Sequence, residues 1–183
     1  MMKRFALGIS LAWVMCWGTL PSAQADNVHV YANREIKPII LQLIERAERT
    51  VDIQMYTFTE QDVIRALQAA QSRGIIVRVL LDPNQSANRK NVDQLINRHI
   101  AVKWAPVSLP AIMHRKLLIV DGREALLGSA NWTHNAFARS YEVDVLLDDP
   151  AALQRLQALF DSDWQQGWLE RETRYPATSR VRR

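Results

Sequence analysis

The sequence predicts an α/β fold, an α-β-α sandwich in which helices cover both faces of a mixed central β-sheet. Strand-like and helix-like segments alternate through the first half, which is typical of β-α units with parallel strands. A hairpin signal in the second half adds antiparallel strands. The residues that follow position 25 fit one domain with a substantial core. They show no internal repeat and no sign of a second domain.

The first half contains several patterns with a clear period. Apolar residues at Ile39, Ile40, Leu43 and Ile44 fall on one face of a helix. The segment 51–58 alternates with period two, as a strand does. The expected elements are strands at 28–31, 51–58, 75–81 and 100–104, and helices at 36–49, 61–72 and 92–98.

The second half is organised around the dipeptide Asp121-Gly122. This pair favours a type I′ hairpin turn, because both central residues of that turn need positive φ. The polar stretch between the hairpin and the next strand carries no assignment. The expected elements are strands at 112–120, 124–127 and 141–147, and a final helix at 151–166.

The N-terminus has the three zones of a secretory signal peptide. Lys3 and Arg4 are followed by an apolar stretch at 5–20 and by the small residues Ala23 and Ala25. We expect cleavage after Ala25 and a periplasmic or secreted protein without stable membrane association. The alternative is a membrane anchor, but the apolar stretch is short of the roughly 20 residues that span a bilayer.

Charge and cysteine content narrow the classes of function. Cleavage would lower Lys+Arg from 23 to 21 against 19 acidic residues, which leaves a mature net charge of +2. It would also remove Cys16, the single cysteine, which excludes disulfides, thiolate zinc sites and a cysteine nucleophile. The basic tail at about 170–183 could touch polyanions or could be a solvated terminus. Its arginines are Arg171, Arg174, Arg180, Arg182 and Arg183.

Two pairs of residues at i and i+2 carry the chemistry. His114 and Lys116 are expected on one strand face, where the imidazole can attack phosphorus while the ammonium neutralises phosphate oxygens. Ser129 and Asn131 can donate neutral hydrogen bonds to the same oxygens from the returning strand. Together these four residues predict a site that acts on a phosphate ester.

Three further residues accompany these pairs. Asp121 lies an odd number of residues from His114, so we expect it, like Gly128, to support the structure rather than touch substrate. A carboxylate at Glu142 could accept a hydrogen bond from Nδ1–H of His114 and hold its tautomer. The alternative for Glu142 is an ordinary salt bridge at the end of a strand.

The segment from His114 to Asn131 matches the H-x-K-x4-D-x6-G-S-x-N signature of the phospholipase D superfamily at every specified position. It looks most like the small secreted bacterial nucleases of that superfamily. The resemblance implies that His114 forms a covalent phosphohistidine and that Glu142 orients it. It also implies that Lys116, Ser129 and Asn131 bind the phosphate.

A single motif copy predicts a homodimer. Larger members of the superfamily carry two copies, in which one histidine is the nucleophile and the other is the general acid. His29, His99 and His134 lack a lysine two residues on, so none rebuilds the motif. We therefore expect two chains to meet at a two-fold axis through the active site. His134 could reach the rim of the cleft, or it could be an ordinary surface histidine.

The expected function is a metal-independent, nonspecific endonuclease that acts on DNA and perhaps RNA. No cofactor is indicated, because Lys116 and its dimer mate supply the charge that Mg²⁺ provides elsewhere. The alternatives are a phospholipase D or phosphatidyl transferase, and an inactive nucleic-acid-binding module. Trp104 and Trp132 could stack on bases or pack in the core, whereas Trp164 and Trp168 are expected to pack.

Overall fold

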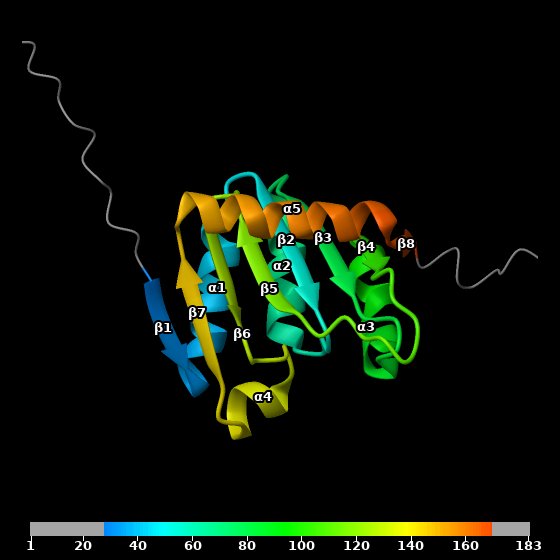
Figure 1. The fold of residues 1–183 in the computed structure, drawn as a ribbon, viewed down its shortest axis with the longest axis horizontal. Coiled ribbons are helices and arrows are strands. Elements are labelled where there is room, and N and C mark those ends of the chain that lie inside the picture. Colours follow the sequence, from blue (N-terminus) through cyan, green and yellow to red (C-terminus); the bar gives the residue numbers. More distant parts are fainter. Residues whose placement is uncertain (1–27, 170–183) are drawn as a thin grey trace, which may run out of the picture.

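A computed structural model of the protein describes residues 28–169. The expected signal peptide, its cleavage site after Ala25 and the basic tail lie outside the described residues. The described part of the chain forms one eight-stranded sheet in the order β1-β7-β6-β5-β2-β3-β4-β8 (Figure 1). The strands are β1 (Val28–Ala32), β2 (Thr50–Met55), β3 (Ile76–Leu81), β4 (Ala101–Trp104), β5 (Lys116–Val120), β6 (Glu124–Gly128), β7 (Val143–Leu147) and β8 (Trp168–Leu169).

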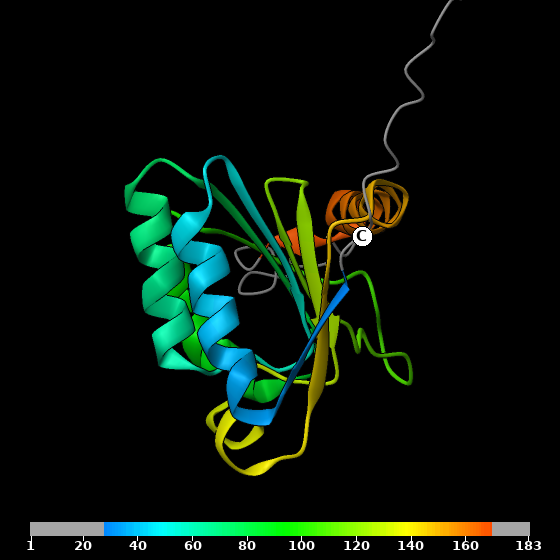
Figure 2. The ribbon, with the colours of Figure 1, turned by 90° about the vertical axis from the view of Figure 1, so that its left-hand side faces the viewer.

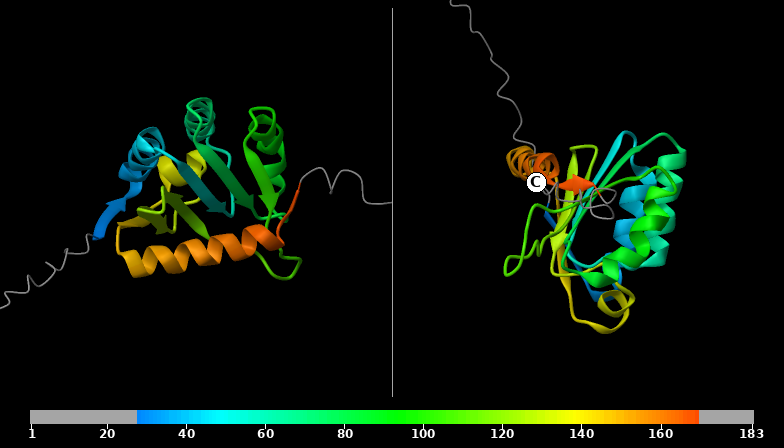
Figure 3. Two further views of the ribbon diagram at one scale, coloured as in Figure 1. Left: turned by 90° about the horizontal axis from the view of Figure 1, so that it is seen from above. Right: turned by 90° about the vertical axis from the view of Figure 1, so that its right-hand side faces the viewer.

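Helices cover both faces of the sheet. Helices α1, α2 and α3 lie side by side on one face, and α5 crosses the other face (Figures 2 and 3). Strands β2, β3 and β4 are parallel, and the remaining neighbours pair antiparallel. The predicted sandwich with a mixed sheet is therefore confirmed. The helices are η1 (Asn33–Glu35), α1 (Ile36–Arg46), α2 (Gln61–Ser72), α3 (Ser86–Ile96), α4 (His134–Arg139) and α5 (Pro150–Gln166).

Each face of the sheet has its own hydrophobic core. The larger core lies between the sheet and α1 to α3, and it includes Ile40, Leu67 and Phe58. The smaller core lies under α5 and includes Leu153 and Phe160. A sheet buried on both faces explains why the strands read as almost continuous apolar runs.

Arg78 interrupts one of these runs for a structural reason. Its guanidinium forms two hydrogen bonds to Asp52, at 2.7 and 2.6 Å, and lies 4.7 Å from the centre of the Phe160 ring. A planar guanidinium suits a bidentate carboxylate and an aromatic face at the same time. The pair therefore joins β2 and β3 to α5.

Several element boundaries differ from the sequence prediction. Helix α3 begins at Ser86 instead of position 92, because the buried side chains of Asn88 and Asn91 bond to the backbone of Phe58. Helix α3 therefore buries polar side chains in its first half. The spacing of apolar residues in the sequence does not indicate a helix there. Helix α4 was not predicted, although Thr133 caps it by accepting from Ala136 N–H. Strand β8 was also missed.

Candidate active site

One edge of the sheet collects the ends of β2, β5, β6 and β7. The register pairs Met55 with Lys116 and Gly128 with Asp144. Because these neighbours are antiparallel, β5 begins where β2 ends, and β7 begins where β6 ends. We call this edge the site edge. The predicted site residues at or just beyond these strand ends are His114, Lys116, Ser129, Asn131 and Glu142.

Lys116 reaches back onto the imidazole of His114. Its Nζ lies 3.0 Å from each ring nitrogen and donates to the carbonyl oxygen of His114 at 2.9 Å. The Tyr56 ring packs edge-on against the imidazole, with 4.5 Å between the centroids, and its own centroid is 5.2 Å from the Lys116 Nζ. The arrangement places a nucleophilic nitrogen and a cation at one point, as attack on a phosphate anion requires.

His114 lies just before β5, whereas the sequence predicts a strand from position 112. The backbone N–H of Met113 donates to Oδ2 of the buried Asp82 at 2.6 Å. Strand β5 itself begins at Lys116, two residues after His114. The hydrogen bond from Met113 fixes the backbone immediately before the imidazole, a role for Asp82 that the sequence did not suggest.

Lys116 is a buried cation of the site. It is 7% exposed, and the Glu142 and Asp144 carboxylates are the charges that act on it. Burial lowers the pKa of the Lys116 ammonium, and the two carboxylates oppose that effect only in part. A cation with little water around it interacts strongly with a bound phosphate.

Ser129 and Asn131 lie beyond the end of β6. The Ser129 hydroxyl donates to the Glu142 carboxylate and accepts from the backbone N–H of Val143 at 3.1 Å. Oδ1 of Asn131 accepts from the backbone N–H of Thr57 at 3.3 Å. The Asn131 amide group has no hydrogen-bond acceptor within residues 28–169, so its N–H donors remain free for a ligand oxygen.

Glu142 is held by its backbone as well as by its side chain. Asn33 clamps it, because Asn33 N–H donates to the Glu142 carbonyl at 2.9 Å and Asn33 Oδ1 accepts from Glu142 N–H at 3.0 Å. Asn33 adopts φ +55°, a conformation that asparagine tolerates better than most residues. The expected hydrogen bond from His114 to Glu142 is not formed in the described residues. Strand β6 lies between β5 and β7, and the Glu142 carboxylate accepts a hydrogen bond from Ser129 instead.

Gly128 lies against Asp144. The sequence analysis gave Asp144 no role in the site. A Cβ on Gly128 would lie 2.1 Å from Oδ1 of Asp144 and 2.4 Å from the Val143 carbonyl oxygen. The same Oδ1 accepts from Ala130 N–H at 3.1 Å. Burial raises the pKa of the Asp144 carboxyl, and backbone hydrogen bonds from Ala130 and Ser129 lower it by less. Asp144 could have been found from the sequence, because it lies two residues after Glu142 and a strand places such residues on one face.

Asp121 lies at the opposite end of β5, away from the site edge. It accepts from the backbone N–H groups of Glu48 (2.9 Å), Arg49 (2.7 Å) and Thr50 (2.8 Å). Burial raises the pKa of its carboxyl, but these three hydrogen bonds together outweigh that effect and lower it. Asp121 and Gly122 both have positive φ, as a type I′ turn requires.

Of the two roles considered for Trp104 and Trp132, the structure shows packing in the core and not base stacking. Trp104 and Trp132 are 1% and 2% exposed, and the Trp132 ring packs edge-on against Phe58. Both belong to the larger core, so neither can stack on a base. Trp164 stacks on Phe160 under α5, in the packing role that was expected. His134 is exposed as the first residue of α4.

Residues 28–169 lack both a metal-binding cluster and a membrane-spanning helix. They contain no group of three or more histidine, cysteine, aspartate or glutamate side chains arranged to hold a metal ion. None of the helices in this range is long and apolar enough to cross a membrane.

Known structures resemble this fold. A phospholipase D family member, Nuc from Salmonella typhimurium, superposes with a TM-score of 0.71 at 26% identity, and covers 78% of this chain and 96% of its own. NucT from Helicobacter pylori gives a TM-score of 0.73 at 25% identity, with 79% of this chain and 99% of NucT covered.

Sequence relatives carry lipid-related names. A mitochondrial cardiolipin hydrolase of Chlamydomonas reinhardtii is 33% identical over 68% of this chain and 55% of its own length. A phospholipase D of Rickettsia prowazekii is 32% identical over 73% and 61%. The chain thus spans little more than half the length of these relatives. The family profile described as "Cardiolipin synthase, PLD-like domain" matches residues 40–164. With this match and the motif at the site edge, the chain belongs to the phospholipase D superfamily.

Proposed function

We propose that this protein is a phosphodiesterase that acts as a metal-independent, nonspecific endonuclease on DNA, with RNA as a further substrate. The observation that carries the phosphodiesterase proposal is the contact between His114 and Lys116 at the site edge, with Ser129, Asn131 and Glu142 nearby. The choice of nucleic acid follows the motif's resemblance to small secreted nucleases. It is supported by a fold that matches Nuc and NucT over almost their whole lengths.

The reaction proceeds in two displacements. A ring nitrogen of His114 attacks phosphorus, so that a P–N bond forms and the P–O bond to the leaving strand breaks. Lys116 and the amide of Asn131 stabilise the negative oxygens as charge develops. A general acid protonates the leaving oxygen. In the second step that same group removes a proton from water, whose oxygen attacks phosphorus and releases His114.

The general acid comes from a second copy of His114 in a homodimer. Within the described residues, the His114 ring contacts Lys116 and Tyr56, and no second histidine reaches it. His29 lies in β1 and His99 lies beyond α3. A two-fold axis at the site edge would bring two motifs together and complete the acid–base pair.

A phospholipid substrate is the second candidate. Two apolar side chains that precede His114 in the sequence, Leu109 and Ile112, are 72% and 44% exposed, and they could enter a lipid surface. The names of the sequence relatives point in the same direction. An inactive binding module is the least supported alternative, because the buried Lys116 is arranged for chemistry. The N-terminal sequence supports a secreted or periplasmic location.

Cleavage of plasmid and single-stranded DNA by the mature protein in excess EDTA tests this proposal. We expect activity in EDTA, and its loss in His114→Ala. His134→Ala, which removes an exposed histidine of α4, is the matched control and should remain active. Acid quenching should trap a phosphohistidine on the wild type. Hydrolysis of cardiolipin vesicles with no DNA cleavage would replace the nuclease by a lipase, and loss of DNA cleavage in EDTA would contradict the mechanism.

A further inference from the structure

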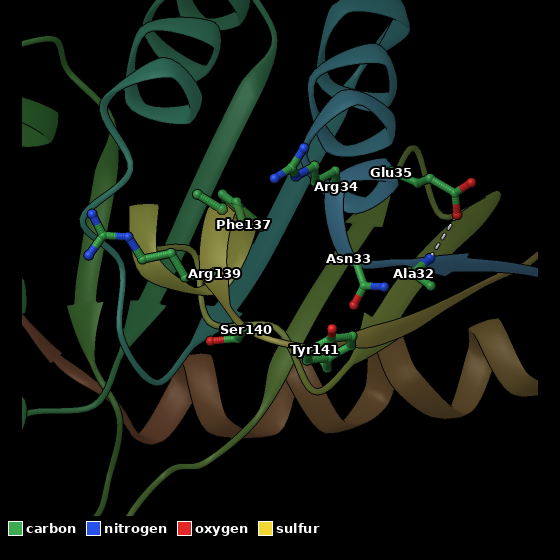
Figure 4. Close-up of a pocket in the computed structure, with 9 residues that line it drawn as sticks. Ala32, Asn33, Arg34, Glu35, Phe137, Arg139, Ser140 and Tyr141 are labelled. Carbon is green, nitrogen blue, oxygen red and sulfur yellow. Dashed lines mark hydrogen bonds between the residues drawn. The ribbon is translucent and has the colours of Figure 1, made fainter.

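A pocket of about 530 Å³ lies between the end of β1 and the end of α4 (Figure 4). Because Ala32 pairs with Val143 at the start of β7, the pocket is at the site edge. One wall is the turn that follows β1, with Asn33 and Arg34. The other wall is the end of α4 and the segment after it, with Arg139, Ser140 and Tyr141. No role has been assigned to this pocket so far.

The two arginines of the pocket have no counter-ion in the described structure. Most arginines between residues 28 and 169 bind a carboxylate, a carbonyl or an aromatic ring. The side chains of Arg34 and Arg139 form no hydrogen bond, ion pair or ring contact there. Glu35, the acid on the pocket wall, is directed elsewhere, since Oε2 accepts from the backbone N–H of Ala32 at 3.0 Å. Two unpaired guanidinium groups favour an anion as ligand.

The pocket and the candidate active site share contacts through Asn33 and Glu142. Asn33, on its wall, is the residue that clamps the Glu142 backbone. Tyr141, which precedes Glu142, is 95% exposed and can offer its ring to a base. A ligand in this pocket would therefore lie beside Glu142.

The order of the strands sets the distance to the nucleophile. The pocket follows β1, and Lys116 begins β5, with β7 and β6 between them. Three strand spacings amount to about 14 Å. A stacked nucleic acid strand advances about 3.4 Å per nucleotide. The pocket thus lies roughly four nucleotides from the reacting phosphate along such a strand.

We propose that Arg34, Arg139 and Tyr141 form a subsite for the substrate strand, in which the two arginines bind backbone phosphates about four nucleotides from the cleaved one and Tyr141 stacks on a base. This inference rests on the proposed nuclease function and deepens it. A polymer with regular phosphates reaches both the subsite and His114, whereas a substrate with one phosphodiester reaches His114 alone. The subsite therefore selects for chain length rather than for sequence.

The test compares the double variant Arg34→Ala, Arg139→Ala with Arg98→Ala, Arg155→Ala. The control removes the same charge from two arginines outside the pocket. The substrates are a thymidine dodecamer and a thymidine dinucleotide. We expect kcat/KM for the dodecamer to fall about tenfold in the pocket variant, from the loss of two charged contacts. The fall for the dinucleotide should be smaller, and the control should match the wild type.

Salt dependence gives a second readout that a structural defect would not produce. On a single strand, each lost phosphate contact reduces the slope of log affinity against log salt by about 0.7, so the double variant should lose about 1.4. Equal losses for both substrates, or an unchanged salt slope, would overturn the subsite while leaving the nuclease intact. A wild type that cleaves neither substrate would overturn the nuclease itself. A shift from dimer to monomer in the pocket variant alone would show that the pocket is an interface between copies.

Discussion

Asp121 and Asp144 lie at opposite ends of the sheet, and each accepts hydrogen bonds from the backbone. Asp121 follows β5 at the end away from the site edge, whereas Asp144 lies in β7 at the site edge, and the two differ in what surrounds them. At the far end, Asp121 accepts from the backbone N–H groups of Glu48, Arg49 and Thr50 at the start of β2, and its carboxyl has a lowered pKa. At the site edge, the buried Asp144 lies near the charges of Glu142 and Lys116, and its carboxyl has a raised pKa. One carboxylate stabilises a turn, and the other takes part in the charge balance of a site.

The comparison teaches that hydrogen bonding and burial act against each other in both places. Enough N–H donors at a partly exposed position favour the charged form of Asp121, whereas desolvation dominates at Asp144. A neighbouring carboxylate at Glu142 adds to that effect. The site edge therefore brings the charges of Asp144, Glu142 and Lys116 close together and shifts the pKa of Asp144 and Lys116. Such shifts are common at functional sites.

The largest effect is expected from Lys116→Met at the site edge. Removal of the cation should lower kcat about a thousandfold, because it interacts with the phosphate in a region of low exposure. The free energy of unfolding should not fall, since a desolvated charge is replaced by an apolar chain of similar length. Nuclease assays and urea unfolding measure the two quantities. Lys90→Met, on the exposed surface of α3, is the control. Retained activity would show that another group neutralises the phosphate.

A steric change at each end of the β5–β6 hairpin gives the next largest effect. In Gly128→Ala the new Cβ meets Oδ1 of Asp144 and the Val143 carbonyl, so the free energy of unfolding should fall by about 3 kcal/mol. In Gly122→Ala the Cβ meets open space, and the cost is the positive φ alone, about 1 kcal/mol. Urea unfolding of both variants measures the difference. Equal losses would mean that the Asp144 carboxylate moves aside without cost.

Asp121→Ala should affect folding and leave catalysis intact. Loss of an acceptor for three N–H groups should lower the free energy of unfolding by about 1–2 kcal/mol, since the turn is partly exposed to water. Because its folded pKa is lowered, Asp121 contributes stability above its unfolded pKa and loses it as pH falls through the folded pKa. Urea unfolding across the acid range should therefore show a weaker pH dependence in the variant. A large loss of kcat would place Asp121 in the site instead.

Much of the fold could be predicted because its elements have strong periods. The helix at 61–72 and the turn at Asp121-Gly122 agree with the structure, as their signals are local. Helix α3 was placed too late because its buried face carries Asn88 and Asn91. Their burial is compensated by the backbone of Phe58, a partner distant in the sequence. Hydrogen bonds between residues distant in the sequence cannot be predicted from the spacing of apolar residues within one segment.

The candidate site also contains residues that could be predicted from the sequence and residues that could not. The motif residues were visible because their spacing along two strands is fixed. The residues that hold them were not, since Asp82, Tyr56 and Asn33 reach the site from the segments that follow β3, β2 and β1. For Trp132 the sequence left two alternatives open, stacking on a base or packing in the core. Only the structure decides between them, because the Trp132 ring packs against Phe58, a residue distant in the sequence.

The smallest effect and the sharpest test of the comparison is Asp144→Asn. The amide oxygen can still accept from Ala130 N–H, so packing is kept while the charge is removed. The folded pKa of Asp144 is raised, so its contribution to stability is present below the unfolded pKa and is lost as pH rises through the folded pKa. Urea unfolding should therefore show that the variant is more stable than the wild type near neutral pH, and that the difference vanishes in acid. The same carboxylate helps to keep Lys116 protonated. Its loss should move the alkaline limb of kcat to lower pH, whereas a purely structural Asp144 would leave that limb unchanged.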